Sequence, residues 1–186
     1  PPQTFVATGL VILMQGAVPV FADIDPMTGN ISPASVRDRI TPRTKAVIPV
    51  HWGGYPCEMD EINAIAAERG LAVVEDAAHA LGATYKGKPI GSLSRFTAFS
   101  FQAIKHLTTG DGGALCCLNQ DDARQANIRR WFGIDRIHSK PSLLGEREYD
   151  LDQLGFKYHM NDLAASLGLA NLMDFRDRLK RRRRNG

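Results

Sequence analysis

The sequence has few cysteines and no long apolar run, and each shortage excludes a class of protein. The three cysteines, Cys57, Cys116 and Cys117, are an odd number, and two of them are adjacent, so we expect no disulfide framework. No CxxC pair or histidine–cysteine cluster has the spacing of a zinc site, and we expect no metal. No apolar run reaches the roughly 18 residues that span a bilayer. These shortages favour a protein of the reducing cytoplasm without a membrane partner.

The positive charge is concentrated near one end of the chain. The net charge is +3, yet Arg176 to Arg184 holds seven basic side chains and one acid, Asp177, so the remainder is net negative. This distribution argues against a general nucleic-acid-binding surface. The basic segment itself has two interpretations. It could bind phosphate backbones, or it could be a solvated helix end where cations favour the C-terminal dipole.

Short apolar runs recur along the chain and predict five strands. Near-continuous apolar runs of this length are typical of strands that are buried on both faces of a sheet. The predicted strands are 19–24, 45–51, 71–76, 97–101 and 113–118.

Longer segments between these runs predict helices. One is expected to begin at Ser32-Pro33, a cap residue followed by a proline in the first turn. The other predicted helices are 4–15, 59–69 (stopped by Gly70), 121–131 and 161–180. Residues 133–154 are polar and irregular and predict a long surface loop. The alternation of strand and helix indicates an α/β domain of three layers, α/β/α, with a mostly parallel sheet.

Polar side chains follow two of the predicted strands, at the edge where ligands collect in open α/β sheets. Asp76 ends one strand and His79 follows it, whereas Ser100 ends another and precedes Lys105, with a glycine-rich turn at 110–113. Each has an ordinary alternative. Asp76 could cap a helix, Ser100 could bond to backbone, Lys105 could be a surface lysine, and the glycines could form a simple hairpin turn. Their order and spacing together are more specific than any one of them.

Two longer motifs resemble a known family. Residues 74–80, with 82–88 and 90–91, look like the aspartate motif of the DegT/DnrJ/EryC1/StrS sugar aminotransferases, and residues 99–113 look like their lysine motif. Four further stretches match in the same order: 3–8, 19–25, 48–51 and 155–160. The resemblance therefore covers nearly the whole chain.

The resemblance implies a fold and its boundaries. The fold would be the large domain of the aspartate aminotransferase-like fold, which binds pyridoxal 5′-phosphate (PLP), incomplete at both ends. Residues 1–160 would be a partial large domain, and residues 161–186 would begin the helix that leads to a C-terminal small domain. Because the family's N-terminal phosphate-cradling segment is not among these residues, we expect the 186 residues alone to bind PLP weakly or not at all.

The resemblance also assigns roles to single residues. Lys105 matches the catalytic lysine, whose amine condenses with the cofactor aldehyde. Asp76 matches the acid that pairs with the pyridine nitrogen and keeps it protonated, so that the ring withdraws electrons. His79 matches a position near the ring, Ser100 a hydroxyl that contacts the phosphate, and Phe5 an aromatic residue stacked on the ring.

Two further positions fall in a segment that approaches the neighbouring subunit's site in the family. Lys157 and His159 occupy the positions where a phosphate or substrate contact is expected, and the sequence does not choose between them. A surface loop before a helix is the alternative. The resemblance implies a homodimer with shared sites.

The implied activity is transfer of an amino group, usually from glutamate, to a nucleotide-linked keto sugar. A dehydratase of the same family is a second interpretation, although such enzymes tend to replace the lysine with histidine; here Lys105 is a lysine, and His106 is its neighbour. A fragment without catalysis is a third interpretation, and nucleic-acid binding through the basic tail is a fourth. The sequence does not name the sugar or the carbon that is aminated.

Overall fold

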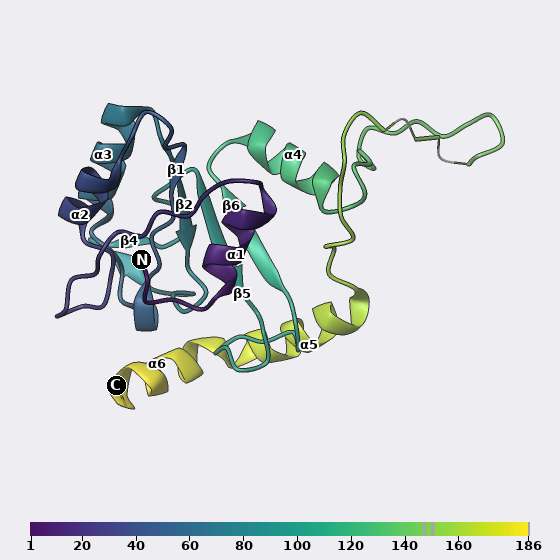
Figure 1. The fold of residues 1–186 in the computed structure, drawn as a ribbon. Coiled ribbons are helices and arrows are strands. Elements are labelled where there is room, and N and C mark those ends of the chain that lie inside the picture. The colour runs from purple at the N-terminus through teal and green to yellow at the C-terminus, as the bar shows by residue number, and fades with distance from the viewer. Residues whose placement is uncertain (147, 150, 186) are drawn as a thin grey trace.

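The computed structural model describes residues 1–146, 148–149 and 151–185 (Figure 1). Its main sheet has the order β1-β2-β5-β6. β1 is parallel to β2 and β2 to β5, whereas β6 is antiparallel to β5. The predicted mostly parallel sheet is therefore confirmed. The strand bounds are Ala46–Val47 for β1, Ala72–Asp76 for β2, Phe96–Ser100 for β5 and Gly113–Cys117 for β6.

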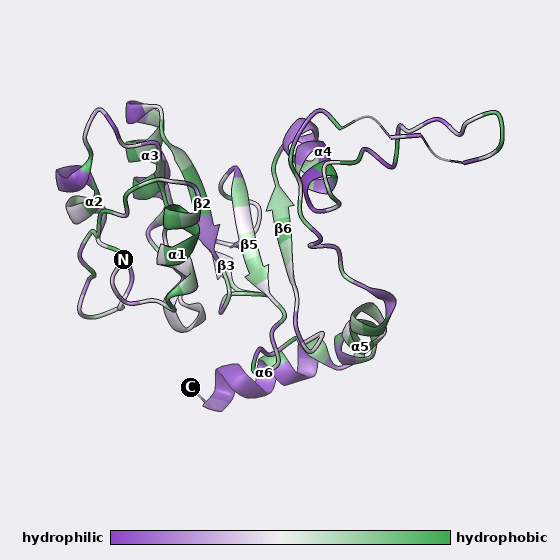
Figure 2. Cartoon of the chain, turned by 45° about the vertical axis from the view of Figure 1, so that its right-hand side comes forward, coloured by the Kyte–Doolittle hydropathy of each residue, from purple (hydrophilic) through white to green (hydrophobic). Residues whose placement is uncertain are grey.

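Helices flank this sheet (Figures 1 and 2). α3 packs on β2 and on α2, and α4 packs on β6. α1 reaches the carboxyl end of β2 through Asp76, whose side chain points to the opposite face from Glu75 because side chains alternate along a strand. The helix bounds are Ala7–Met14 for α1, Pro33–Arg39 for α2, Met59–Arg69 for α3, Gln120–Arg129 for α4, Asp162–Met173 for α5 and Phe175–Asn185 for α6, with a 3-10 turn η1 at Trp52–Gly54.

The core lies between α3 and one face of the sheet. Ile62 and Ile65 of α3 are 0% and 1% exposed, and they belong to one cluster with Val73 of β2 and Phe99 of β5. Each isoleucine buried in this way contributes roughly 1.5–3 kcal/mol to folding. This packing fixes the positions of β2 and β5 relative to α3, and therefore also the positions of the polar residues at the ends of these strands.

The prediction of a strand at 19–24 is wrong. This segment makes a single antiparallel bridge, between Ile24 and Ile31, outside the sheet. The main chain of Asp23 is bonded locally instead, because its N–H donates to Ser35 Oγ at 2.8 Å and its carbonyl accepts from Ser32 N–H at 2.9 Å. Phe21 is 55% exposed, so the apolar run is not buried as a strand of the sheet would require.

Two other predicted elements are divided. The strand at 45–51 is reduced to β1, with a separate bridge from Val50 to Asp76. Pro49, which lies between them, has no N–H to donate to a ladder. The helix predicted over 161–180 is two helices, α5 and α6, which meet at Asp174.

A short hairpin was not predicted. β3 (Thr84–Tyr85) and β4 (Lys88–Pro89) pair across a two-residue turn, Lys86-Gly87, in which both residues have positive φ. Between α4 and α5, the described residues contain no helix or ladder strand, which agrees with the predicted loop; its residues 147 and 150 lie outside the described part. None of the described helices is long and apolar enough to cross a membrane.

Candidate active site

The carboxylate of Asp76 is the best-defined polar group at the edge of the sheet. Its Oδ2 accepts a hydrogen bond from the Thr8 hydroxyl at 2.7 Å, and its Oδ1 accepts from the Ala78 N–H at 3.1 Å. The Thr8 hydroxyl in turn lies 2.7 Å from that of Thr4. Since the Thr8 proton is given to Asp76, Thr8 accepts from Thr4. Asp76 therefore does more than bond to the turn that follows it, because α1 supplies a second donor.

Thr8 was missed by the sequence prediction. It is 9% exposed and lies in α1 among apolar residues. A hydroxyl in such a run gives no signal that it faces a carboxylate 68 positions away. Phe5, which was predicted, lies one turn before Thr8 and is 75% exposed. The contact between Thr8 and Asp76 thus brings the segment that carries Phe5 to the end of β2.

His79 and Lys105 are close enough to interact electrostatically. Burial lowers the pKa of His79, and the positive charge of Lys105 lowers it further. The His79 ring also meets the Trp52 ring edge-on, with centroids 5.5 Å apart. Lys105 is half-buried and is held in a turn by its N–H, which donates to the Gln102 carbonyl at 2.9 Å. Lys105 is therefore not a fully exposed surface lysine.

Ser100 ends β5 on the same edge of the sheet. Its Oγ accepts from the Gln102 N–H at 3.3 Å, and its partner across the ladder is Gly113. A Cβ at Gly113 would lie 2.5 Å from the Phe99 carbonyl oxygen, so only glycine fits there. The glycine-rich turn therefore belongs to the connection between β5 and β6, and it permits a close approach of the two chains.

α5 and α6 pack against the loop that carries Lys105 (Figure 2). The His106 ring stacks on Phe175 with centroids 5.6 Å apart, and its Nε2 lies 2.8 Å from the Leu81 carbonyl. Asn171 donates to the Thr108 carbonyl at 3.3 Å, and Arg183 donates to that of Gly82 at 2.7 Å. The two helices hold the Lys105 loop and the turn after His79 together.

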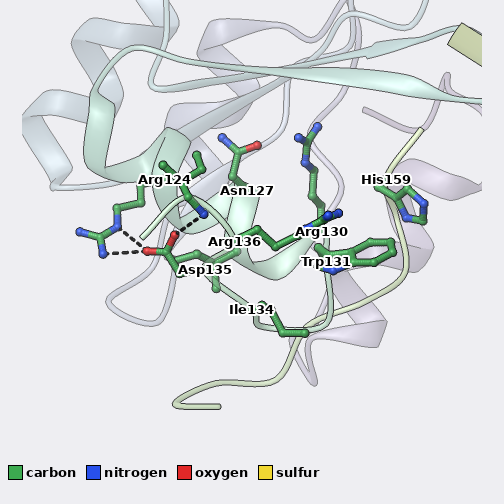
Figure 3. A pocket seen from close by; sticks show the side chains of 10 residues that line it. Arg124, Asn127, Arg130, Trp131, Ile134, Asp135, Arg136 and His159 are labelled. Carbon is green, nitrogen blue, oxygen red and sulfur yellow. Dashed lines mark hydrogen bonds and ion pairs between the residues drawn. The ribbon is translucent and has the colours of Figure 1, made fainter. Parts of the chain in front are cut away.

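Lys157 and His159 lie beside the end of α4. Lys157 forms an isolated bridge with Trp131, and the His159 ring meets the Trp131 indole edge-on at 4.1 Å. His159 and Trp131 line a cavity of about 110 Å³, together with Arg124 and Asp135, which form an ion pair (Figure 3). Lys157 and His159 thus contact Trp131, just after the end of α4, whereas Asp76, His79, Ser100 and Lys105 gather at the sheet edge.

Within the described residues, no group of three or more histidine, cysteine, aspartate or glutamate side chains could hold a metal ion. The three cysteines are free, and burial raises the pKa of the Cys57 thiol to about 12. The polar side chains at the sheet edge are a carboxylate, an imidazole, a hydroxyl and an amine, from Asp76, His79, Ser100 and Lys105.

Known proteins resemble this chain over nearly its whole length. The spore coat polysaccharide biosynthesis protein SpsC of Bacillus subtilis is 46% identical over 182 residues, which are 97% of this chain and 47% of SpsC. The GDP-perosamine synthase of Caulobacter vibrioides is 40% identical over 184 residues, 99% of this chain and 47% of the synthase. The chain thus spans about half the length of the curated relatives it matches.

Solved structures agree with the fold. DesI, determined in the presence of its TDP-sugar product, matches with a TM-score of 0.84 at 39% identity, over 100% of this chain and 44% of DesI. The PMP-form of Spr1654 from Streptococcus pneumoniae matches with a TM-score of 0.85 at 32% identity, over 97% of this chain and 50% of Spr1654. All of residues 1–186 match one family model, and the chain belongs to the DegT/DnrJ/EryC1/StrS aminotransferase family.

Proposed function

We propose that the sheet edge around Asp76 and Lys105 is the cofactor end of a PLP-dependent sugar aminotransferase. The observation that carries this proposal is the Asp76 carboxylate, fixed by the Thr8 hydroxyl and the Ala78 N–H, together with the half-buried Lys105; the charges of both residues act on His79. These two hydrogen bonds hold both oxygens of the Asp76 carboxylate in a fixed orientation. An ionised, oriented carboxylate is the partner that a protonated pyridine nitrogen requires.

The remaining residues fit the other parts of PLP. Ser100 offers a hydroxyl for the phosphate, and the exposed ring of Phe5 offers a face for stacking. His79 would lie along the ring, with its pKa lowered so that the neutral imidazole is favoured. When bound, the cofactor would supply an electron sink for the carbon that gains or loses the amine.

In this proposal each residue has one task. Asp76 holds the proton of the ring nitrogen in place. The Lys105 amine would take up the proton of the substrate carbon as a general base and would then give it back as a general acid. Ser100 fixes the phosphate end, so that the reacting carbon stays within reach of Lys105.

We propose a nucleotide-linked keto sugar as the acceptor and glutamate as the donor. Support comes from the resemblance to a GDP-perosamine synthase and to DesI, whose structure was determined with a TDP-sugar product. The PMP-form of Spr1654 supports a cofactor that carries the amine between two half-reactions. Lys157 and His159 remain candidates for contacts with substrate or with a neighbouring subunit. A cytoplasmic homodimer, with residues 1–160 in the large domain and 161–186 leading out of it, completes the proposal.

The dehydratase alternative is not favoured. Lys105 keeps the amine that such enzymes tend to lack. His106, the neighbouring candidate to replace it, is already bonded at the Leu81 carbonyl and stacked on Phe175. Its imidazole would have to leave both partners before it could act on a substrate.

The test uses the whole protein that contains these residues. We expect added PLP to give the absorbance band of a lysine-bound cofactor, and glutamate to replace it with that of the aminated form. Lys105→Ala and the charge-preserving Lys105→Arg should both lose the first band, because neither has a primary amine on a lysine stem. Retention of the band in either variant would overturn the assignment of Lys105. Absence of amine transfer from glutamate to GDP- and TDP-linked keto sugars would overturn the substrate class.

A further inference from the structure

On the face of the sheet opposite the Asp76 carboxylate, three polar side chains form a buried chain. His51, Glu75 and Thr97 are each 0% exposed. Glu75 Oε2 lies 2.8 Å from His51 Nε2, and its Oε1 accepts from the Thr97 hydroxyl at 3.0 Å. Burial of such groups is unfavourable unless every hydrogen-bonding atom has a partner. The tasks proposed above for Asp76, Lys105 and Ser100 leave this chain unexplained.

The geometry fixes where the imidazole proton of His51 lies. Its Nδ1 accepts a hydrogen bond from the Cys57 N–H at 3.0 Å. A ring nitrogen that accepts from a backbone N–H carries no proton of its own. The proton is therefore on Nε2, which donates to Glu75. His51 thus links the loop 51–57 to β2, because its Nδ1 bonds to Cys57 in the loop and its Nε2 bonds to Glu75 in β2.

The main chain of Asp76 is hydrogen-bonded to His51 at the start of this loop and to Pro49 just before it. The Asp76 N–H donates to the Pro49 carbonyl at 2.8 Å, and the Asp76 carbonyl accepts from the His51 N–H at 3.1 Å. His51 therefore bonds to two consecutive residues of β2, because its side chain donates to Glu75 and its main-chain N–H donates to the Asp76 carbonyl. Movement of the His51 side chain would therefore be transmitted to the residue that carries the carboxylate.

The loop also supports His79. Trp52 follows His51 and meets the His79 ring edge-on. The main chain of Gly54 approaches the His79 carbonyl so closely that a Cβ at Gly54 would lie 2.8 Å from its oxygen. Both residues that face the proposed ring site, Asp76 and His79, therefore rest on a loop that the His51 side chain closes.

We propose that His51 is a positioning residue, which acts through its bonds to Glu75 and Cys57 to hold Asp76 and His79 in the geometry that the cofactor ring requires. This inference rests on the proposed function, because that function supplies the ring. Glu75 and Thr97 complete the same device from β2 and β5. The device differs from ordinary core packing in that its hydrogen bonds, and not only the side-chain volumes, determine it.

Four variants of the whole protein separate the effect of the hydrogen bonds from that of side-chain volume. His51→Asn keeps an acceptor near Cys57 and loses the bond to Glu75, and Thr97→Val removes a hydroxyl at nearly constant volume. We expect both to weaken PLP binding on the order of tenfold, the scale of loss when groups that orient metal ligands are removed, and to shift the absorbance band of bound PLP. Thr97→Ser restores the hydroxyl and should restore both. Glu75→Gln should remain close to wild type, because its amide oxygen can face His51 Nε2 while its NH₂ donates to Thr97 Oγ1.

The matched control is Ile62→Val, a core substitution in α3 that lowers stability without touching these bonds. If His51→Asn and Thr97→Val change PLP affinity and spectrum no more than Ile62→Val does, the positioning role is refuted. A readout without cofactor is the NMR spectrum of the protein labelled with ¹⁵N in histidine. We expect the His51 proton on Nε2 in the wild type, and a proton on Nδ1 would overturn the inference. If the wild type shows this tautomer but binds no PLP, the proposed function has failed, and the positioning role falls with it.

Discussion

At the scale of single residues, Asp76 shows how much depends on a donor that a substitution can remove. Of the two donors to its carboxylate, the Ala78 N–H belongs to the main chain and the Thr8 hydroxyl to a side chain. Only the second can be deleted without changing the backbone. Thr8 therefore offers a direct measure of what the orientation of Asp76 contributes.

We expect Thr8→Val to destabilise the protein by about 1 kcal/mol, the net value of one hydrogen bond. It should also weaken PLP binding by the whole protein, because one oxygen of Asp76 loses its buried partner. Urea denaturation and cofactor titration measure the two effects. Thr8→Ser keeps the hydroxyl and serves as the control. Equal PLP affinity in the valine and serine variants would show that this bond does not orient Asp76.

His79 predicts a dependence of stability on pH. Its pKa is lowered by burial and then by Lys105, so the folded protein favours the neutral ring. Between the lowered pKa and the ordinary value of about 6.5, the unfolded chain binds more protons than the folded one. Stability should therefore be undiminished above about pH 6.5 and fall as the pH decreases below it. Urea denaturation of the wild type and of His79→Gln on both sides of that pH checks this, and the variant should show the smaller decrease. An identical decrease in both proteins would assign it to other groups.

At the scale of elements, the connection between β5 and β6 leaves no room for a side chain. A Cβ at Gly113 would lie 2.5 Å from the Phe99 carbonyl oxygen, and the two strands would have to separate. We expect Gly113→Ala to cost about 1–3 kcal/mol of stability, the usual cost of overpacking. Gly9→Ala in α1 is the matched control, because nothing lies within 4 Å of its Cβ and alanine favours a helix by up to about 1 kcal/mol. A Gly113→Ala variant as stable as Gly9→Ala in urea denaturation would contradict the close approach.

The sequence predicted elements well where local patterns and packing agree. α3 has the predicted bounds, and β2 and β5 were placed to within a residue or two, because apolar periodicity reports the face that is buried. The segment at 19–24 shows the limit. Its apolar run is typical of a strand, but a strand must pair with a neighbouring strand of the sheet. The main chain of Asp23 bonds to Ser32 and Ser35 instead.

The candidate site divides along the same line. Asp76 and Lys105 could be found from the sequence because they follow strands within recognisable motifs. Thr8 and His51 could not, because their importance lies in contacts between distant segments that no local pattern encodes. The break at Asp174 was missed because the residues on both sides of it favour a helix.

At the scale of the whole molecule, two helices present apolar side chains to solvent. α5 has no buried residue, and Leu163, Leu169 and Met173 are 85%, 67% and 86% exposed; on α1, Met14 is 70% exposed. Contiguous exposed apolar surface is typical of interfaces. The chain also spans about half the length of its curated relatives.

We therefore expect the 186 residues, produced alone, to associate with increasing concentration and to bind a hydrophobic dye. They should also bind PLP weakly or not at all. Sedimentation velocity, dye fluorescence and cofactor titration measure these properties, with the whole protein as the control. A monomeric chain that binds PLP as tightly as the whole protein would contradict this expectation.

The stacking of His106 on Phe175 predicts how these two positions change among homologous sequences. The contact joins the residue next to Lys105 to the first turn of α6, so a change on one side leaves the other with an unmatched ring face. Selection should then act on the pair and not on either position alone. Among homologous chains, we expect the residue identities at positions 106 and 175 to covary. The first residue of α6 would then change together with the residue next to the lysine.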